Sequence, residues 1–166
     1  MNLRATLSIF VIAFLAGGCA STLRAPAAPG SQRESVGESR RAEEASGEQL
    51  VRIATGFIGT PYKFGGDDPH GFDCSGLVFY SYDRMGIEVP RTAADQRRAA
   101  ERVKRDRITP GDLVFFRNSA RKVDHVGIYA GAGRFIHAPR SGHVVSFAYL
   151  DDPYYRSHFV SAGRLR

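Results

Sequence analysis

Tryptophan is absent from the 166 residues of this chain, and cysteine occurs only twice, at Cys19 and Cys74. Two cysteines cannot form a disulfide scaffold, and they are too few for a cysteine-rich structural zinc site. Hydrophobic residues make up 43% of the sequence and charged residues 24%, a balance that excludes a disordered or fibrous chain. The length suits one domain of ordinary size. Each cysteine therefore needs its own explanation.

The first apolar stretch has the features of a targeting signal. Arg4 gives it a positive start, and residues 5–15 are mostly apolar, too few to span a bilayer, which takes about 20 residues. Small residues then lead directly to Cys19, in an order that resembles the lipoprotein box of bacterial signals. The resemblance implies a signal peptide at 1–18 and a lipid on Cys19; with Ala20 next, it implies sorting to the outer membrane. The alternative is an ordinary signal peptide with an incidental cysteine.

Residues 20–47 have the composition of a linker. They contain prolines and no aromatic residue, and their four arginines balance four glutamates. Such a segment cannot bury a core, so we expect Cys19 and a flexible linker over 19–47, followed by one folded domain at 48–166. A short helix at 40–45 is the alternative. With Cys19 lipidated, Cys74 is a lone free thiol in an oxidising compartment, where such thiols are usually avoided.

Helical and strand patterns follow one another along the domain. Apolar spacing and capping residues predict helices over 46–58, 75–85 and 92–103. Short apolar runs predict strands over 113–116, 126–129, 134–137 and 144–147, with a hairpin turn at 131–133. Helices followed by strands indicate an α+β fold with an antiparallel sheet.

Three side chains form a candidate catalytic group. Cys74 precedes the second predicted helix, where free N–H groups and the helix dipole are expected to lower the pKa of a thiol and to stabilise an oxyanion. His125 begins one predicted strand and His137 ends the next, so the hairpin brings both to one edge of the sheet. This arrangement suits a nucleophile, its base and a residue that orients the base. Two other interpretations remain open: a buried apolar cysteine, or a zinc site with these three ligands.

Several segments, taken in order, resemble the NlpC-type cell-wall peptidases, which are papain-like cysteine peptidases. These segments are FDCSGLV at 72–78, TPGDLVFF at 109–116, HVGIY at 125–129 and FIHA at 135–138, with further matches GTPY at 59–62, GG at 65–66 and PRT at 90–92 followed by Gln96. The resemblance extends from Glu48 to Arg164. It implies a papain-like α+β fold in which N-terminal helices pack on an antiparallel sheet and the nucleophile starts a helix.

The resemblance also implies roles for individual residues. It makes Cys74 the nucleophile, His125 the base and His137 the third polar residue, and none of the three is substituted. The implied reaction is hydrolysis of a peptidoglycan stem-peptide amide through a thioester, without a metal or other cofactor. The implied bond is either D-glutamyl–diaminopimelate or the D-alanyl–diaminopimelate cross-link.

Four further residues belong to the implied groove. Tyr62 matches an aromatic residue that lines the site, and Asp73 and Ser75 are expected to contact the substrate. Phe64 stands where many members have tryptophan, a change expected to alter the groove and not the mechanism.

The expected partners are peptidoglycan stem peptides and a membrane held through the N-terminal lipid, with the protein a monomer on the periplasmic side. Residues 48–166 carry 18 basic and 13 acidic groups of a chain with net charge +6. The basic stretch at 97–107 is interpreted as a solvated surface or as a surface attracted to anionic wall or lipid; without a nucleic-acid-binding signature, no nucleic acid is expected. Two rival functions are a catalytically silent wall-binding module and an acyltransferase or amidase.

Overall fold

The computed structural model describes residues 29–118 and 122–166, so the predicted signal peptide and Cys19 lie outside the described residues. The elements are α1 (Pro29–Thr55), β1 (Asp67–Asp68), β2 (Gly71–Phe72), α2 (Cys74–Asp83), α3 (Ala93–Ala99), β3 (Glu101–Val103), the 3-10 helix η1 (Arg105–Arg107), β4 (Leu113–Phe116), β5 (His125–Gly131), β6 (Arg134–His137), β7 (Ser146–Tyr149), α4 (Pro153–His158) and β8 (Phe159–Arg164). Across this part of the chain, the helices are too short or too polar to cross a membrane.

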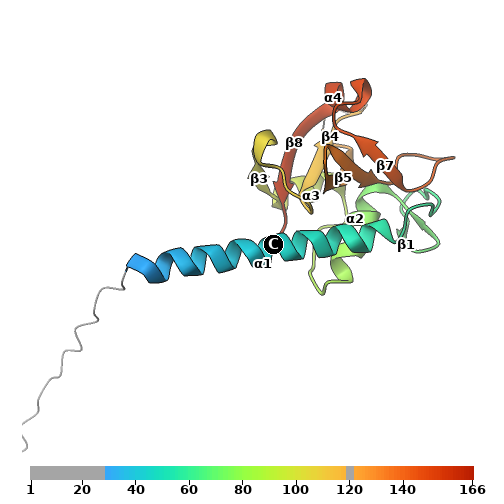
Figure 1. The fold of residues 1–166 in the computed structure, drawn as a ribbon. Helices are drawn as coiled ribbons and strands as arrows, with labels where there is room; N and C mark the ends of the chain where they lie inside the picture. The colour runs from blue at the N-terminus through green and yellow to red at the C-terminus, as the bar shows by residue number, and fades with distance from the viewer. Residues whose placement is uncertain (1–28, 119–121) are drawn as a thin grey trace, which may run out of the picture.

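An antiparallel sheet of six strands forms the frame of the domain. Its strand order is β3-β8-β4-β5-β6-β7, and α1 and α2 lie together on one side of it (Figure 1). The central strand β4 is buried along its whole length because both of its faces are covered. Leu113 and Phe115 join the core beneath the helices, whereas Val114 and Phe116 join a second cluster on the opposite face. The expected α+β fold, with helices packed on an antiparallel sheet, is confirmed.

The strand predictions are accurate where an apolar run ends at a turn. The predicted ranges of β4 and β6 match the structure, whereas β7 lies two residues later than expected. The prediction of a third helix reaching residue 103 is wrong. The backbone turns extended at Ala100, and Glu101–Val103 pairs as an edge strand with β8. This pairing satisfies main-chain groups that a longer helix would leave unpaired on β8.

Helix α1 differs most from the sequence prediction. Residues 29–47 are helical rather than a flexible linker, and Ser46, predicted to cap a new helix, lies inside α1. Pro29 suits a first helical position, and no proline follows it within the helix. The helix docks through Glu43, whose carboxylate accepts hydrogen bonds from Arg164 at 3.0 Å and pairs with Arg166 at 3.1 Å. Tertiary contacts of this kind stabilise a helix that composition alone does not predict.

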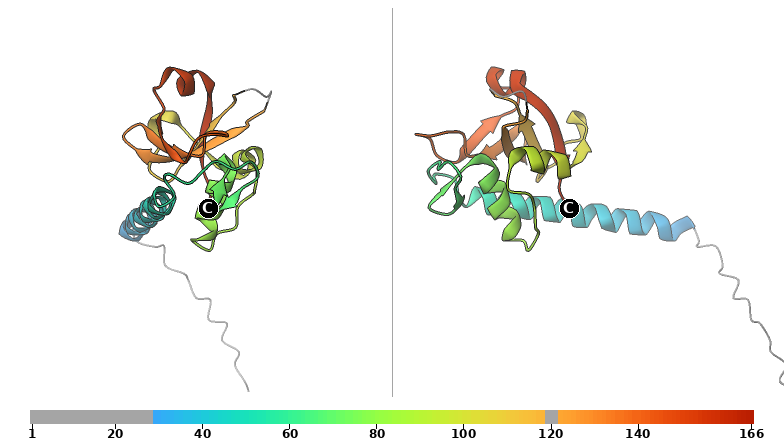
Figure 2. Two further views of the ribbon diagram at one scale, coloured as in Figure 1. Left: turned by 90° about the vertical axis from the view of Figure 1, so that its right-hand side faces the viewer. Right: turned by 180° about the vertical axis from the view of Figure 1, so that it is seen from behind.

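A close backbone approach fixes the position of α1 against the domain. A Cβ atom on Gly47 would lie 2.2 Å from the carbonyl oxygen of Pro110, so only glycine allows this contact. The C-terminus lies beside the middle of α1, and the first turns of the helix extend past the domain (Figures 1 and 2). The second half of α1 is therefore an integral part of the fold.

Candidate active site

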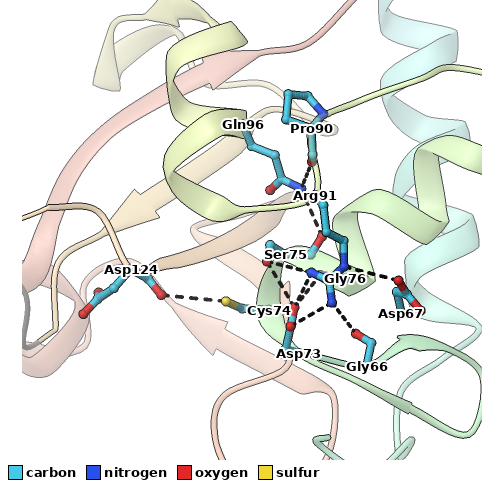
Figure 3. A network of polar contacts seen from close by, with 10 residues as sticks. All are labelled: Gly66, Asp67, Asp73, Cys74, Ser75, Gly76, Pro90, Arg91, Gln96 and Asp124. Carbon is cyan, nitrogen blue, oxygen red and sulfur yellow. Dashed lines mark hydrogen bonds and ion pairs between the residues drawn. The ribbon is translucent and has the colours of Figure 1, made fainter. Parts of the chain in front are cut away.

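Cys74 is the first residue of α2. The carboxylate of Asp73 caps this helix by accepting a 2.6 Å hydrogen bond from the N–H of Gly76. The Sγ atom of Cys74 lies 3.9 Å from the carbonyl oxygen of Asp124, the residue directly before β5 (Figure 3). The N–H of Val126 also approaches this sulfur. The thiol therefore lies against the start of β5, close to main-chain groups of Asp124 and Val126, the two neighbours of His125.

The two histidines meet at the same edge of the sheet, as the hairpin predicted. The Nε2 atom of His125 lies 2.9 Å from the Nδ1 atom of His137, and their rings are nearly perpendicular. Both side chains are buried. Because these two nitrogens are hydrogen-bonded to each other, Nδ1 is the ring nitrogen of His125 that remains for proton exchange with the thiol.

Tyr155, which no sequence signal identified, completes the row of polar side chains formed by Cys74, His125 and His137. Its hydroxyl lies 3.4 Å from Nε2 of His137, and its ring stands nearly perpendicular to the imidazole. Tyr155 comes from α4, which begins with a cap formed by Asp152 and with Pro153 in the first turn. Asp-Pro is a helix-start signal that could have identified this helix. Nothing in the segment points to His137, since that contact is tertiary.

The geometry of the three residues differs from that of a metal site. Within residues 29–118 and 122–166, no group of three or more His, Cys, Asp and Glu side chains is arranged to hold a metal ion. The nearest nitrogens of His125 and His137 point at each other rather than at a common point. The arrangement suits proton transfer along a line from Cys74 to His125.

Arg91 binds the start of α2 to its surroundings (Figure 3). Its guanidinium donates to both carboxylate oxygens of Asp73, at 3.0 and 2.9 Å. It also donates to the carbonyl oxygen of Gly66 at 3.1 Å and to the carboxylate of Asp67 at 3.3 Å. The fork of an arginine is suited to hold several acceptors at once. Arg91 therefore fixes the helix start that presents Cys74.

Ser75 belongs to the same network. Its hydroxyl donates to Asp73 at 3.1 Å and accepts from Arg91 at 3.1 Å, while Gln96 donates to its carbonyl oxygen at 3.0 Å. The polar atoms of Asp73 and Ser75 thus already have partners within the protein. The prediction that these two residues contact substrate stays a prediction. The sequence motif contained Arg91 and Gln96, but it carried no sign of these contacts.

The charges of the site differ from the sequence-based expectation. Burial raises the pKa of the Cys74 thiol to about 11, against the opposing effect of nearby main-chain N–H groups. Burial also lowers the pKa of His125 to about 4 and that of His137 to about 3. The expected lowering of the thiol pKa is therefore wrong for the free protein, because desolvation exceeds the effect of the helix start. These pKa shifts favour a neutral thiol and neutral imidazoles at neutral pH.

At the helix cap, hydrogen bonds outweigh burial. Burial tends to raise the pKa of Asp73, but hydrogen bonds from Arg91 and from the N–H of Gly76 hold that pKa below its ordinary value. Asp73 therefore stays ionised beside a neutral Cys74, and Arg91 compensates its charge.

Tyr62, the aromatic residue that the family resemblance assigns to the groove, lies near Cys74 and Asp73. Burial raises the pKa of Tyr62, and the proximity of Cys74 and Asp73 adds to the effect. Its main-chain N–H donates to the carbonyl oxygen of His143 at 2.8 Å, which joins it to the loop after β6. Phe64, by contrast, is 90% exposed, so it projects into solvent.

Comparison with known proteins gives matches over the same region. The model of the NlpC/P60 family matches residues 59–164. The murein DD-endopeptidase MepH of Escherichia coli is 46% identical over 113 residues, which are 65% of this chain and 42% of that protein. The gamma-DL-glutamyl hydrolase of Bacillus subtilis is also 46% identical, over 118 residues, which are 69% of this chain and 28% of that protein.

A solved structure shows the same fold. The crystal structure of an NlpC/P60 family protein from Bacillus cereus has a TM-score of 0.68 and 34% identity, and the match covers 71% of this chain and 39% of that one. The chain thus spans less than half the length of each of these three proteins.

Proposed function

Because this chain belongs to the NlpC/P60 family, we propose that it is a peptidoglycan endopeptidase that hydrolyses stem-peptide amide bonds. One observation carries the proposal: the thiol that starts α2 faces the strand start of His125, whose imidazole is hydrogen-bonded to His137. A nucleophile, a base and an orienting group in this order are what acyl transfer to a thiol requires. The names of the relatives support the substrate class.

The mechanism starts from a neutral Cys74 thiol and a neutral His125 imidazole. Nδ1 of His125 takes the thiol proton of Cys74 as the sulfur attacks the carbonyl carbon of the scissile amide. The N–H groups of Cys74 and Ser75 lie near the sulfur and are placed to stabilise the oxyanion. His125 then gives its proton to the leaving amine, the C–N bond breaks and a thioester forms. Water, deprotonated by His125, hydrolyses the thioester and restores the thiol.

The bond we propose is the D-alanyl–diaminopimelate cross-link. The relative named a murein DD-endopeptidase supports this choice, as does the lipoprotein-like signal, which suits an enzyme anchored beside the wall. The D-glutamyl–diaminopimelate bond is the second candidate. It is favoured by the gamma-DL-glutamyl hydrolase, which matches at the same 46% identity.

Digestion of purified muropeptides by the wild-type chain and by Cys74→Ala tests the function. Mass spectrometry of the products distinguishes the bonds, because cross-link cleavage converts dimers into monomers whereas the second cleavage shortens the stem after D-glutamate. Activity should survive a chelator and be lost to a thiol alkylator. Equal inactivity of wild type and Cys74→Ala would favour a wall-binding module, and a product that contains an added amine would indicate acyl transfer.

We also propose that the domain is held at a membrane in the cell envelope through a lipid on Cys19. The small residues before Cys19 support this proposal. Labelled fatty acid should be incorporated into the wild-type protein and not into Cys19→Ala, which should move to the soluble fraction. Membrane association of Cys19→Ala without label would contradict lipid anchoring.

A further inference from the structure

A pocket of about 460 Å³ opens beside His125. Its wall includes Arg140 from the loop after β6, and Tyr154 and Tyr155 from α4. Neither Cys74 nor Tyr62 contributes to this wall. The pocket therefore lies on the imidazole side of the candidate active site, away from the start of α2.

The side on which a pocket lies indicates which part of the substrate it receives. In the proposed reaction, the carbonyl carbon bonds to Cys74, and the leaving nitrogen takes its proton from His125. A proton transfer of this kind needs the nitrogen within hydrogen-bond reach of the imidazole. The residue that carries the leaving amine must then extend past His125, into the pocket.

Arg140 gives this pocket a positive charge. No aspartate or glutamate contributes to the pocket wall, and none of the ion pairs within the described ranges includes Arg140. The guanidinium acts on Tyr155: burial raises the pKa of this tyrosine to about 12, Tyr154 and Asp152 add to that rise, and the charge of Arg140 opposes it. Arg140 therefore lies near Tyr155 in the pocket wall, and its charge is available to an anionic ligand.

The loop that carries Arg140 is tied to the opposite side of the site. The N–H of His143 donates to the carbonyl oxygen of Arg140 at 3.1 Å, which closes a tight turn. Gly142 takes a φ of +80° in this turn, a conformation that favours glycine. The N–H of Tyr62 in turn donates a hydrogen bond to the carbonyl oxygen of His143 at 2.8 Å. These bonds position the loop before a substrate arrives, which reduces the entropy lost on binding.

The expected leaving group carries a matching charge. Diaminopimelate has two amino groups and two carboxyl groups, and in the D-alanyl cross-link a free carboxylate sits on the carbon that bears the leaving nitrogen. An arginine fork can bind such a carboxylate through two parallel hydrogen bonds. We propose that Arg140 binds the free carboxylate of the amine-side residue and thereby selects substrates with that carboxylate over their carboxamide forms. This proposal rests on the proposed endopeptidase function.

Two synthetic stem peptides that differ only in this group test the proposal. One has the free carboxylate next to the leaving nitrogen, and the other has a carboxamide. Wild type should hydrolyse the carboxylate form with a kcat/KM about 10- to 100-fold higher, as expected for charge-assisted hydrogen bonds. Arg140→Gln should lose most of that preference, and Arg140→Lys should keep part of it. Arg156→Gln is the matched control, because Arg156 lies on α4 but does not line the pocket.

The outcomes separate this proposal from the function on which it rests. Equal rates on both peptides with wild type would overturn the role of Arg140 while leaving the endopeptidase intact. An active Arg140→Gln variant that keeps the full preference would also overturn it. If wild type cleaves neither peptide nor muropeptides, the proposed function fails, and the role of Arg140 fails with it. Thermal unfolding of each variant checks that the loop substitution has not unfolded the domain.

Discussion

The hydroxyl of Tyr155 lies 3.4 Å from Nε2 of His137, at the far end of the row that begins with Cys74. For His125 to accept the thiol proton at Nδ1, its Nε2 must carry the hydrogen and donate to Nδ1 of His137. A neutral His137 then carries its hydrogen on Nε2, where only an acceptor stabilises it. The oxygen of Tyr155 is that acceptor, so Tyr155 favours the histidine tautomers that the proposed reaction needs.

Tyr155→Phe should therefore lower kcat by about 3- to 10-fold with little change in KM, the size expected for one net hydrogen bond. The effect should act through His137, so Tyr155→Phe should cost little more in a His137→Gln background. Kinetics of the two single variants and the double variant measure this coupling. Tyr149→Phe, at an exposed position on β7, is the control. Fully additive losses would contradict a positioning role.

The reactivity of Cys74 should report a neutral thiol. With the thiol pKa raised to about 11 and that of His125 lowered to about 4, the thiolate fraction is small at neutral pH. Alkylation by iodoacetamide should then rise about tenfold per pH unit from pH 6 to pH 9, because only the thiolate reacts. A rate that is level across this range would instead indicate a preformed thiolate–imidazolium pair.

The histidine pair should also make stability depend on pH. Burial lowers the pKa of His125 to about 4 and of His137 to about 3, whereas an unfolded histidine titrates near its ordinary value of about 6.5. Between about pH 4 and 6.5 the unfolded chain therefore binds more protons, so stability rises with pH in that window and is lost as pH falls. Urea unfolding should show a loss of about 2 to 5 kcal/mol from pH 7 to pH 4.5.

A variant isolates that contribution from the carboxylates. His137→Gln removes one of the two buried imidazoles, so its stability should fall less steeply over the same pH range. Parallel pH profiles of wild type and His137→Gln would contradict the assignment to the histidines.

Removal of Arg91 should destabilise the start of α2. Arg91→Met leaves Asp73, whose side chain is only 14% exposed, without its ion-pair partner. Because the arginine itself is 31% exposed, water moderates the loss, and we expect about 1 to 2 kcal/mol in urea unfolding together with reduced activity. Arg98→Met breaks an exposed pair with Asp95 and serves as the control. A similar small effect of both substitutions would contradict the role given to Arg91.

Local sequence signals predicted the parts of the site that depend on neighbouring residues. The apolar runs at β5 and β6 and the glycine turn between them defined the hairpin, and so the meeting of His125 and His137 could be predicted. Arg91 binds Asp73, which lies 18 residues earlier in the chain, and Tyr155 contacts His137, which is also 18 residues earlier. Such contacts arise from tertiary packing, which periodicity does not encode. The helical state of residues 29–47 was missed for the same reason.

The docking of α1 offers a last test, because two charges meet Arg164 in different surroundings. Asp112 is 1% exposed and receives Arg164 at 2.7 Å, whereas Glu43 on α1 is 31% exposed. Arg164→Gln removes the ion-pair partner of a buried carboxylate and should cost about 2 to 4 kcal/mol in urea unfolding. Glu43→Gln should barely change the midpoint of urea unfolding, since the ion pair between Glu43 and Arg164 is near the surface.

Glu43→Gln should instead loosen α1 locally, so that trypsin cleaves faster after Arg40 and Arg41 while the domain stays folded. Glu44→Gln, at an exposed neighbouring position, is the matched control for this proteolysis. Unchanged cleavage in Glu43→Gln would mean that the close approach of Gly47 to Pro110 is enough to hold the helix. Faster cleavage of Glu43→Gln would show that the ion pair between Glu43 and Arg164 is also needed, because Glu43→Gln and Glu44→Gln both keep the contact between Gly47 and Pro110.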